Sequence, residues 1–175
     1  MAEAPAPVPH VPAEVSQPLL SACLFRLGGA LFGVDVKSAR EVAVFDDITM
    51  VPRGPAHLLG VANLRGTVMP IVDVRAMLGL GGGARSGRAM KALVIRDDRV
   101  QVAVAVEDVV GLEPFEEIAP LEPGTDIPGR AFGRGLLRWG GGVATLLDAP
   151  GLLEALRAEM RRTEPAGRPA PGEAA

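Results

Sequence analysis

The stretch Gly60–Leu78, GVANLRGTVMPIVDVRAML, decides the local fold of this chain. Two apolar runs, Leu58–Ala62 and Val68–Val72, flank the polar segment Asn63–Gly66, and this pattern is typical of a tight hairpin. The glycine of the polar segment can adopt the positive φ that a short turn requires. The sequence therefore predicts two antiparallel strands, with Arg65 at the exposed tip between them.

The residues after the turn predict where the second strand lies and how it ends. Pro70 has no backbone N–H to donate to a sheet ladder, so we expect an edge or barrel-rim strand at this point. Asp73 precedes a short apolar-spaced segment and is interpreted as the N-cap of a helical turn. Gly79 fits the C-terminal end of that turn.

Composition restricts the kind of protein that this chain can be. Its 175 residues, 48% hydrophobic and 3% aromatic, fit one domain or two small subdomains with an aliphatic core. The formal net charge of −3 gives no electrostatic reason to expect nucleic acid or an anionic membrane as a partner. A single cysteine and two histidines exclude a disulfide framework and a multi-histidine metal site within one chain. We find no signal peptide and no apolar run of ~20 residues, and therefore expect a cytoplasmic protein.

The chain is expected to hold one folded region between two tails. Residues 1–18 and 163–175 are rich in Pro and Ala without periodicity, which predicts disordered extensions. Residues 19–162 form the expected domain, and its second half repeats the first. Phe32–Val36 aligns with Val102–Val106, and after a short shift Ile71–Asp73 aligns with Leu146–Asp148. A repeat of short strands and tight turns predicts a mainly β fold of two small barrels.

A longer helix is expected after Asp148, which is interpreted as its N-cap. Apolar residues at helical spacing form one stripe on this helix: Leu152, Leu153, Leu156 and Met160. We expect the stripe to pack across the barrels and close the core. The alternative is that the stripe binds a partner.

Catalytic side chains do not converge in this sequence. Asp73 and Asp148 are the only repeated acids, and both have the simpler interpretation of helix caps. Cys23 alternates with Phe25 and Leu27 on what is predicted to be a buried strand face. We therefore expect no enzyme activity and no cofactor.

Two charged residues are harder to explain by the fold alone. Arg65 stands at a hairpin tip within an otherwise apolar run, and Glu41 begins an apolar strand. Each one alone is most simply a solvated turn residue. Together they are typical of a polar rim around a small apolar patch, which favours a binding protein.

The segments Gly60–Gly66 and Met69–Arg75 together resemble the signature of the CheW family of chemotaxis coupling proteins, and the resemblance covers roughly residues 20–155. It implies two intertwined SH3-like five-stranded β-barrel subdomains, related by an internal pseudo-two-fold, with a C-terminal helix. It also implies a non-enzymatic scaffold that couples transmembrane chemoreceptors to a CheA-type histidine kinase. Such a protein would reside in the cytoplasm at membrane-associated receptor arrays.

The resemblance further implies two sets of contact residues. The cytoplasmic receptor tip would dock in the groove between the barrels, at positions that match Ala39, Glu41, Gly60, Asn63 and Arg65. Ala39 departs from the family pattern, which often has a larger branched residue there. The kinase would contact the first barrel through Phe45, Asp46, Ile48 and Thr49.

Two alternatives remain open from the sequence. The first is a CheW-like adaptor of a motility or developmental pathway. The second is a β-barrel that binds a small ligand or nucleic acid, because such barrels host both functions. The acidic balance, and the lack of a basic patch interleaved with aromatic residues, count against nucleic acid.

Overall fold

The computed structural model describes residues 20–81, 89–115, 117–139 and 142–163. This part of the chain folds into 11 strands, one short 3-10 helix, η1 (Arg130–Phe132), and one α-helix, α1 (Ala149–Thr163). The predicted extension 1–18 lies outside the described residues. So does the predicted tail, except for Thr163, which ends α1.

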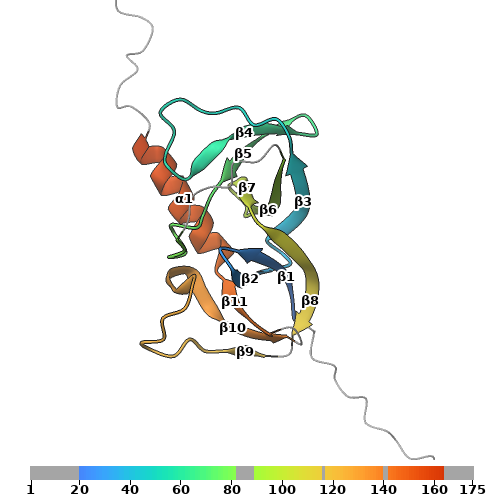
Figure 1. Ribbon diagram of the computed structural model, residues 1–175, viewed down its shortest axis with the longest axis vertical. Helices are drawn as coiled ribbons and strands as arrows, with labels where there is room; N and C mark the ends of the chain where they lie inside the picture. Colours follow the sequence, from blue (N-terminus) through green and yellow to red (C-terminus); the bar gives the residue numbers. More distant parts are fainter. Residues whose placement is uncertain (1–19, 82–88, 116, 140–141, 164–175) are drawn as a thin grey trace, which may run out of the picture.

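The strands form two sheets (Figure 1). The six-stranded sheet has the order β8 (Asp108–Phe115), β1 (Leu20–Leu27), β2 (Ala30–Asp35), β11 (Gly142–Leu147), β10 (Gly133–Trp139) and β9 (Ile118–Ala119). The five-stranded sheet has the order β3 (Ala39–Phe45), β6 (Met90–Arg96), β7 (Gln101–Ala105), β5 (Thr67–Val72) and β4 (Leu58–Leu64). The fold is mainly β with one C-terminal helix, which confirms the predicted fold class.

Each sheet takes strands from both halves of the chain. The hairpin β1–β2 comes from the first half but pairs with strands of the second, and the hairpin β6–β7 does the reverse. The predicted repeat is visible in the pairing, because Val72 pairs in parallel with Val104 and Leu147 pairs in parallel with Val34. The sequence alignment had placed these residues at equivalent positions.

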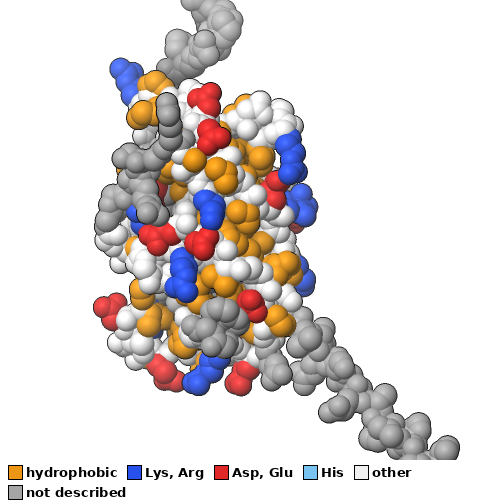
Figure 2. Space-filling model, turned by 45° about the vertical axis from the view of Figure 1, so that its right-hand side comes forward, with side chains coloured by type: hydrophobic (Ala, Val, Ile, Leu, Met, Phe, Trp, Pro, Cys, Tyr) orange, Lys and Arg blue, Asp and Glu red, His pale blue; other side chains and the backbone are white. Residues whose placement is uncertain are grey.

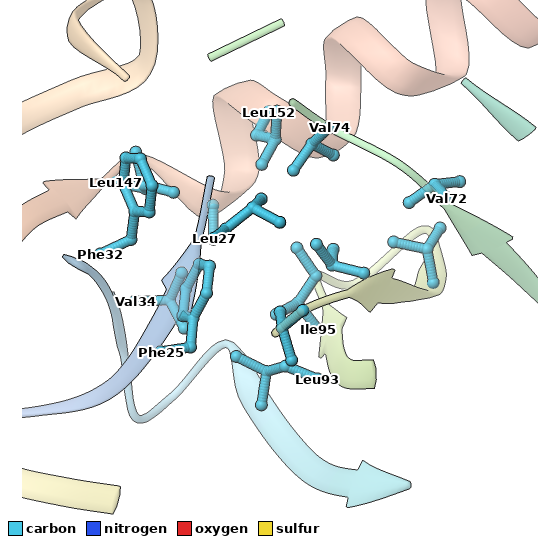
Figure 3. Packing of buried hydrophobic residues seen from close by; sticks show 14 of the residues in the cluster. Phe25, Leu27, Phe32, Val34, Val72, Val74, Leu93, Ile95, Leu147 and Leu152 are labelled. Atoms are coloured by element: carbon cyan, nitrogen blue, oxygen red, sulfur yellow. The ribbon is translucent and has the colours of Figure 1, made fainter. Parts of the chain in front are cut away.

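The main hydrophobic core lies where the two sheets and α1 meet (Figure 3). Phe25 and Phe32 stack there with ring centroids 5.8 Å apart. Leu152, Leu153 and Leu156 of α1 are at most 1% exposed, and full burial of one such side chain contributes about 1.5–3 kcal/mol. The apolar stripe of α1 is therefore core, as the first interpretation predicted, and the alternative of a partner-binding stripe is wrong for these leucines.

The prediction that Pro70 marks an edge or rim strand is wrong. β5 lies between β4 and β7. Its ladder with β7 consists of Ile71 and Val72, however, so it begins only after the proline. The missing N–H of Pro70 therefore removes no bond from that ladder, which is why an inner strand tolerates the residue.

Candidate partner-binding surface

The hairpin β4–β5 holds Arg65 at its tip in a fixed conformation. Leu64 pairs with Thr67, and the two residues between them, Arg65 and Gly66, have φ angles of 51° and 86°. Positive φ at both central residues defines a type I′ turn. The Gly66 N–H also donates to Oδ1 of Asn63 over 2.7 Å. The predicted tight hairpin with an exposed arginine at its tip is confirmed.

Arg65 and Glu41, which the sequence marked separately, form an ion pair. Nη2 of Arg65 lies 2.9 Å from Oε2 of Glu41, and the pair joins the hairpin tip to β3. The Arg65 side chain is 80% exposed, whereas that of Glu41 is 29% exposed. An exposed pair of this kind adds little to stability. Nη1 of Arg65 also donates to Oε1 of Glu41 over 3.4 Å, and the other guanidinium N–H groups remain available to a partner.

Gly60 is a buried residue of β4 against which residues 48 and 49 pack. It is buried, its φ is 153°, and a Cβ there would lie 2.5 Å from the carbonyl oxygen of Thr49 and 2.6 Å from Cγ2 of Ile48. Thr49 and Val61 exchange two backbone hydrogen bonds of 2.8 Å directly beside it. Gly60 therefore allows residues 48–49 to lie against β4 and is no exposed contact residue itself.

An open hollow of about 460 Å³ lies between β3 and the hairpin β4–β5. Its walls carry exposed apolar side chains, with Val44 59% and Val68 70% exposed. The residues that line it are Val44, Phe45, Asp46, Asp47, Thr49, Val61, Ala62, Asn63 and Val68. We call it the β3–β4 hollow. The exposed Asp46 and Asp47 make its rim acidic.

The four predicted kinase-contact residues differ in exposure. Asp46 and Thr49 are exposed, but Phe45 is 4% exposed and belongs to the core of the five-stranded sheet, with Ile48 packed against it. Phe45 shares the inner face of β3 with Ala43, two residues before it, which is why its side chain points into that core. Asn63 of the predicted receptor set also lines the β3–β4 hollow. The two predicted sets are therefore neighbours along β4 and do not lie on opposite faces.

The exposed valines of β3 were not predicted from the sequence. Val42 and Val44 are 46% and 59% exposed, and Leu112 of β8 is 62% exposed. Figure 2 brings the side with β3 and β8 forward and shows hydrophobic side chains across its middle, with Lys and Arg along its edge. Apolar residues on both faces of Glu41–Phe45 were the available signal, because a half-buried strand alternates with polar residues. Ala39 is partly buried at the start of β3, against the main core.

Neither a nucleophile nor a metal site emerges in the described part of the chain. Burial raises the pKa of the Cys23 thiol, which keeps it in the unreactive thiol form. None of the residues described there forms a group of three or more His, Cys, Asp or Glu side chains that could hold a metal ion. The only α-helix described, α1, is not long and apolar enough to span a bilayer.

The family comparison covers both sheets and the hairpin that carries Arg65. Residues 21–157 match the family described as the CheW-like domain. The chain belongs to this family. The resemblance carried by the hairpin motif is therefore confirmed.

Several named proteins are similar to this CheW-like domain. A probable chemotaxis protein CheW of Rhizobium etli is 35% identical over 118 residues, which are 65% of this chain and 74% of that protein. Chemotaxis protein CheW of Rhizobium meliloti is 33% identical over 129 residues, 71% of this chain and 81% of that protein. Protein FrzA of Myxococcus xanthus is 32% identical over 104 residues, 58% of this chain and 64% of that protein.

A solved structure supports the fold. The scaffolding protein TtCheW from Thermoanaerobacter tengcongensis superposes with a TM-score of 0.64 at 23% identity, and the match covers 74% of this chain and 89% of that one. At this identity the similarity shows the shared fold alone.

Proposed function

We propose that this CheW-like domain is a non-enzymatic scaffold that couples transmembrane chemoreceptors to a CheA-type histidine kinase. The observation that carries the proposal is the exposed Arg65 at a rigid hairpin tip, paired with Glu41 of β3. Membership of the family and the names of the relatives support it. The scaffold would work in the cytoplasm, at membrane-associated receptor arrays.

The receptor contact would use Arg65, Glu41, Asn63 and Ala39 on the five-stranded sheet. A guanidinium can donate two parallel hydrogen bonds to a carboxylate or to the carbonyl groups of a receptor helix. The exposed Val42 and Val44 lie on the opposite face of β3 from Glu41. They would offer a separate apolar surface to such a helix. Gly60 contributes indirectly, through the position of residues 48–49.

The kinase contact would use the exposed part of the segment Phe45–Thr49. Asp46 and Thr49 present their side chains to solvent at the β3–β4 hollow, while Phe45 and Ile48 support the segment from within. This arrangement places an acidic, hydrogen-bonding rim around an apolar floor, as in the polar rim and apolar centre of many interfaces.

A second candidate is the same adaptor role in a motility or developmental pathway. Relatives named FrzA and PilI match this chain at 32% and 31% identity. The family therefore extends beyond proteins that are named for chemotaxis. Both candidates predict the same two partner classes and differ only in the receptor and kinase that are bound.

The substitution Arg65→Glu tests the proposal. It removes the guanidinium and adds repulsion against any acid on the receptor. Loss of one partner of a buried charge pair typically costs about 2–5 kcal/mol of binding, which is at least about a thirtyfold loss of affinity. We expect receptor-tip binding to be lost while a kinase fragment still binds, with each partner measured separately by titration calorimetry.

The matched control is the double variant Arg65→Glu with Glu41→Lys. It restores an ion pair between the hairpin tip and β3 with reversed charges, so the local structure regains its link. If the loss of receptor binding came only from the broken internal pair, this variant would bind the receptor again. Unimpaired receptor binding by the single variant would remove Arg65 from the contact.

A further inference from the structure

The turn that follows the proposed kinase segment Phe45–Thr49 exposes several apolar residues in succession. Met50 is 80% exposed, the largest exposed fraction among the large hydrophobic residues that the structure describes, and the adjacent Val51 is 41% exposed. Pro52 and Arg53 follow and are also exposed. We call Met50–Gly54 the projecting turn. Isolated exposed apolar residues need no explanation, but Met50, Val51 and Pro52 are exposed in direct succession, which does.

The projecting turn is held rigidly. The Gly54 N–H donates to the Val51 carbonyl over 3.1 Å and closes a four-residue turn with Pro52 at its second position. On one side Thr49 is fixed to Val61 by two hydrogen bonds of 2.8 Å. On the other side, the Leu58 N–H donates to the Pro55 carbonyl over 2.9 Å. The backbone of the turn therefore has little conformational entropy left to lose on binding, although the exposed Met50 side chain still has its rotamer freedom to lose.

Arg53 occupies a strained backbone position. Its φ is 59°, and it stands at the third position of the turn, directly after Pro52. Proline at the second position and positive φ at the third are typical of a type II turn, whose third position prefers glycine or asparagine. Only Arg53 and Arg65 have positive φ among the described residues other than glycine. Within the described part of the chain, Arg53 makes no side-chain hydrogen bond or ion pair that would offset the strain. Residues with backbone strain of this kind cluster at functional sites, where they bind a ligand or a partner.

We infer that the projecting turn is a docking element that inserts Met50 and Val51 into an apolar pocket of the kinase. Arg53 then pairs with a carboxylate at the edge of that pocket. The inference rests on the proposed function, because the turn directly continues the segment Phe45–Thr49. Methionine fills irregular apolar pockets well, and arginine is enriched at the energetic centres of interfaces. The kinase surface opposite is therefore apolar with an acidic rim.

Two substitutions test the docking element by titration of the full-length protein with a CheA-type kinase fragment. Arg53→Gly removes the strain, so the melting temperature should rise, by about 2–4 °C for each 1 kcal/mol released. At the same time the affinity for the kinase should fall about tenfold or more. Met50→Ser should weaken kinase binding similarly and leave the melting temperature unchanged, because its side chain is exposed. A rise in stability with a loss of affinity is the signature that a purely structural turn cannot produce.

Control variants separate this inference from the proposed function. Val143→Ser removes a valine that is 57% exposed on the six-stranded sheet and should bind the kinase normally. Asp46→Lys reverses a charge on the proposed contact segment itself. If Asp46→Lys weakens kinase binding while Met50→Ser and Arg53→Gly bind like the wild type, the docking element is refuted and the proposed function stands. If the wild type binds no CheA-type kinase, both are refuted.

Discussion

Asn63 shows how an exposed residue of a predicted contact set can act through its neighbour. Its Oδ1 accepts the Gly66 N–H and stabilises the turn that holds Arg65 at positive φ. The residue therefore positions the arginine, whatever direct contact it also makes. The family resemblance assigned it to the receptor set but could not separate these two roles.

We predict that Asn63→Ala destabilises the protein by about 1 kcal/mol, the typical net contribution of one hydrogen bond. Asn63→Asp keeps the acceptor oxygen and should retain most of this stability. Urea unfolding curves of the two variants check the prediction. Equal stability of the alanine and aspartate variants would show that the bond to Gly66 does not matter.

Asp73 and Arg75 form a mostly buried ion pair directly after β5. Nη2 of Arg75 lies 2.7 Å from Oδ2 of Asp73, and the Arg75 N–H also donates to Oδ1 over 3.0 Å, as expected of the predicted cap. Burial by itself raises the pKa of the Asp73 carboxyl, but the hydrogen bonds and charge of Arg75 outweigh burial and hold this pKa below its usual value. Sequence predicted the cap but missed the pairing with Arg75.

This lowered pKa predicts a pH dependence of stability. Because the folded-state pKa lies below the unfolded value of about 3.9, the Asp73 carboxylate stabilises the fold above that pH. The contribution is lost as the pH falls through the folded-state pKa. The difference in unfolding free energy between wild type and Asp73→Asn should therefore be largest near neutral pH and shrink below about pH 4. A difference that stays constant down to pH 2 would contradict the assignment.

At the scale of elements, α1 begins where the sequence predicted. The Asp148 carbonyl accepts the Leu152 N–H over 3.0 Å, and a Cβ at Gly151 would collide with the Asp148 carboxylate. The carboxylate thus lies at the positive end of the helix, where a negative charge is favourable. The small residue at position 151 leaves room for it.

We predict that Asp148→Ala lowers stability by about 1 kcal/mol and the melting temperature by about 2–4 °C. Asp148→Asn keeps a polar side chain at the start of the helix and should lose less. Both variants should bind receptor and kinase normally, since α1 packs on the core. Loss of binding at an unchanged melting temperature would instead place Asp148 in a surface site.

At the scale of the whole molecule, the exchange of hairpins between the two sheets makes the halves of the chain depend on each other. Without the second half, the five-stranded sheet lacks β6 and β7, and without the first half the six-stranded sheet lacks β1 and β2. The main core takes residues from all four of these strands. Neither half alone can therefore bury its apolar surface.

We predict that a chain divided between residues 85 and 86 gives two fragments that are each unfolded but fold when mixed. Separate and mixed fragments should be compared by circular dichroism and by thermal melting. A cooperative melt of either fragment by itself would show that the exchanged hairpin is dispensable.

The sequence by itself determined what depends on neighbouring residues. The tight hairpin turn with Gly66 at positive φ, the cap at Asp73 and the apolar stripe of α1 follow from backbone preferences and periodicity over a few positions. Even the internal repeat was visible, because both copies share the same local pattern. These features are local, so a reader of the sequence can recognise them without knowing how the chain folds back.

Only the tertiary structure decided which distant residues meet. Arg65 reaches Glu41 across 24 positions, Asn63 lies beside the segment Phe45–Thr49, and Thr49, next to the projecting turn, pairs with Val61. The structure also decided which half supplies each hairpin to each sheet. Contacts of this kind depend on the net gain from burying one shared core against the entropy of closing long loops. This balance depends on residues from the whole chain, so no single segment of the sequence predicts it.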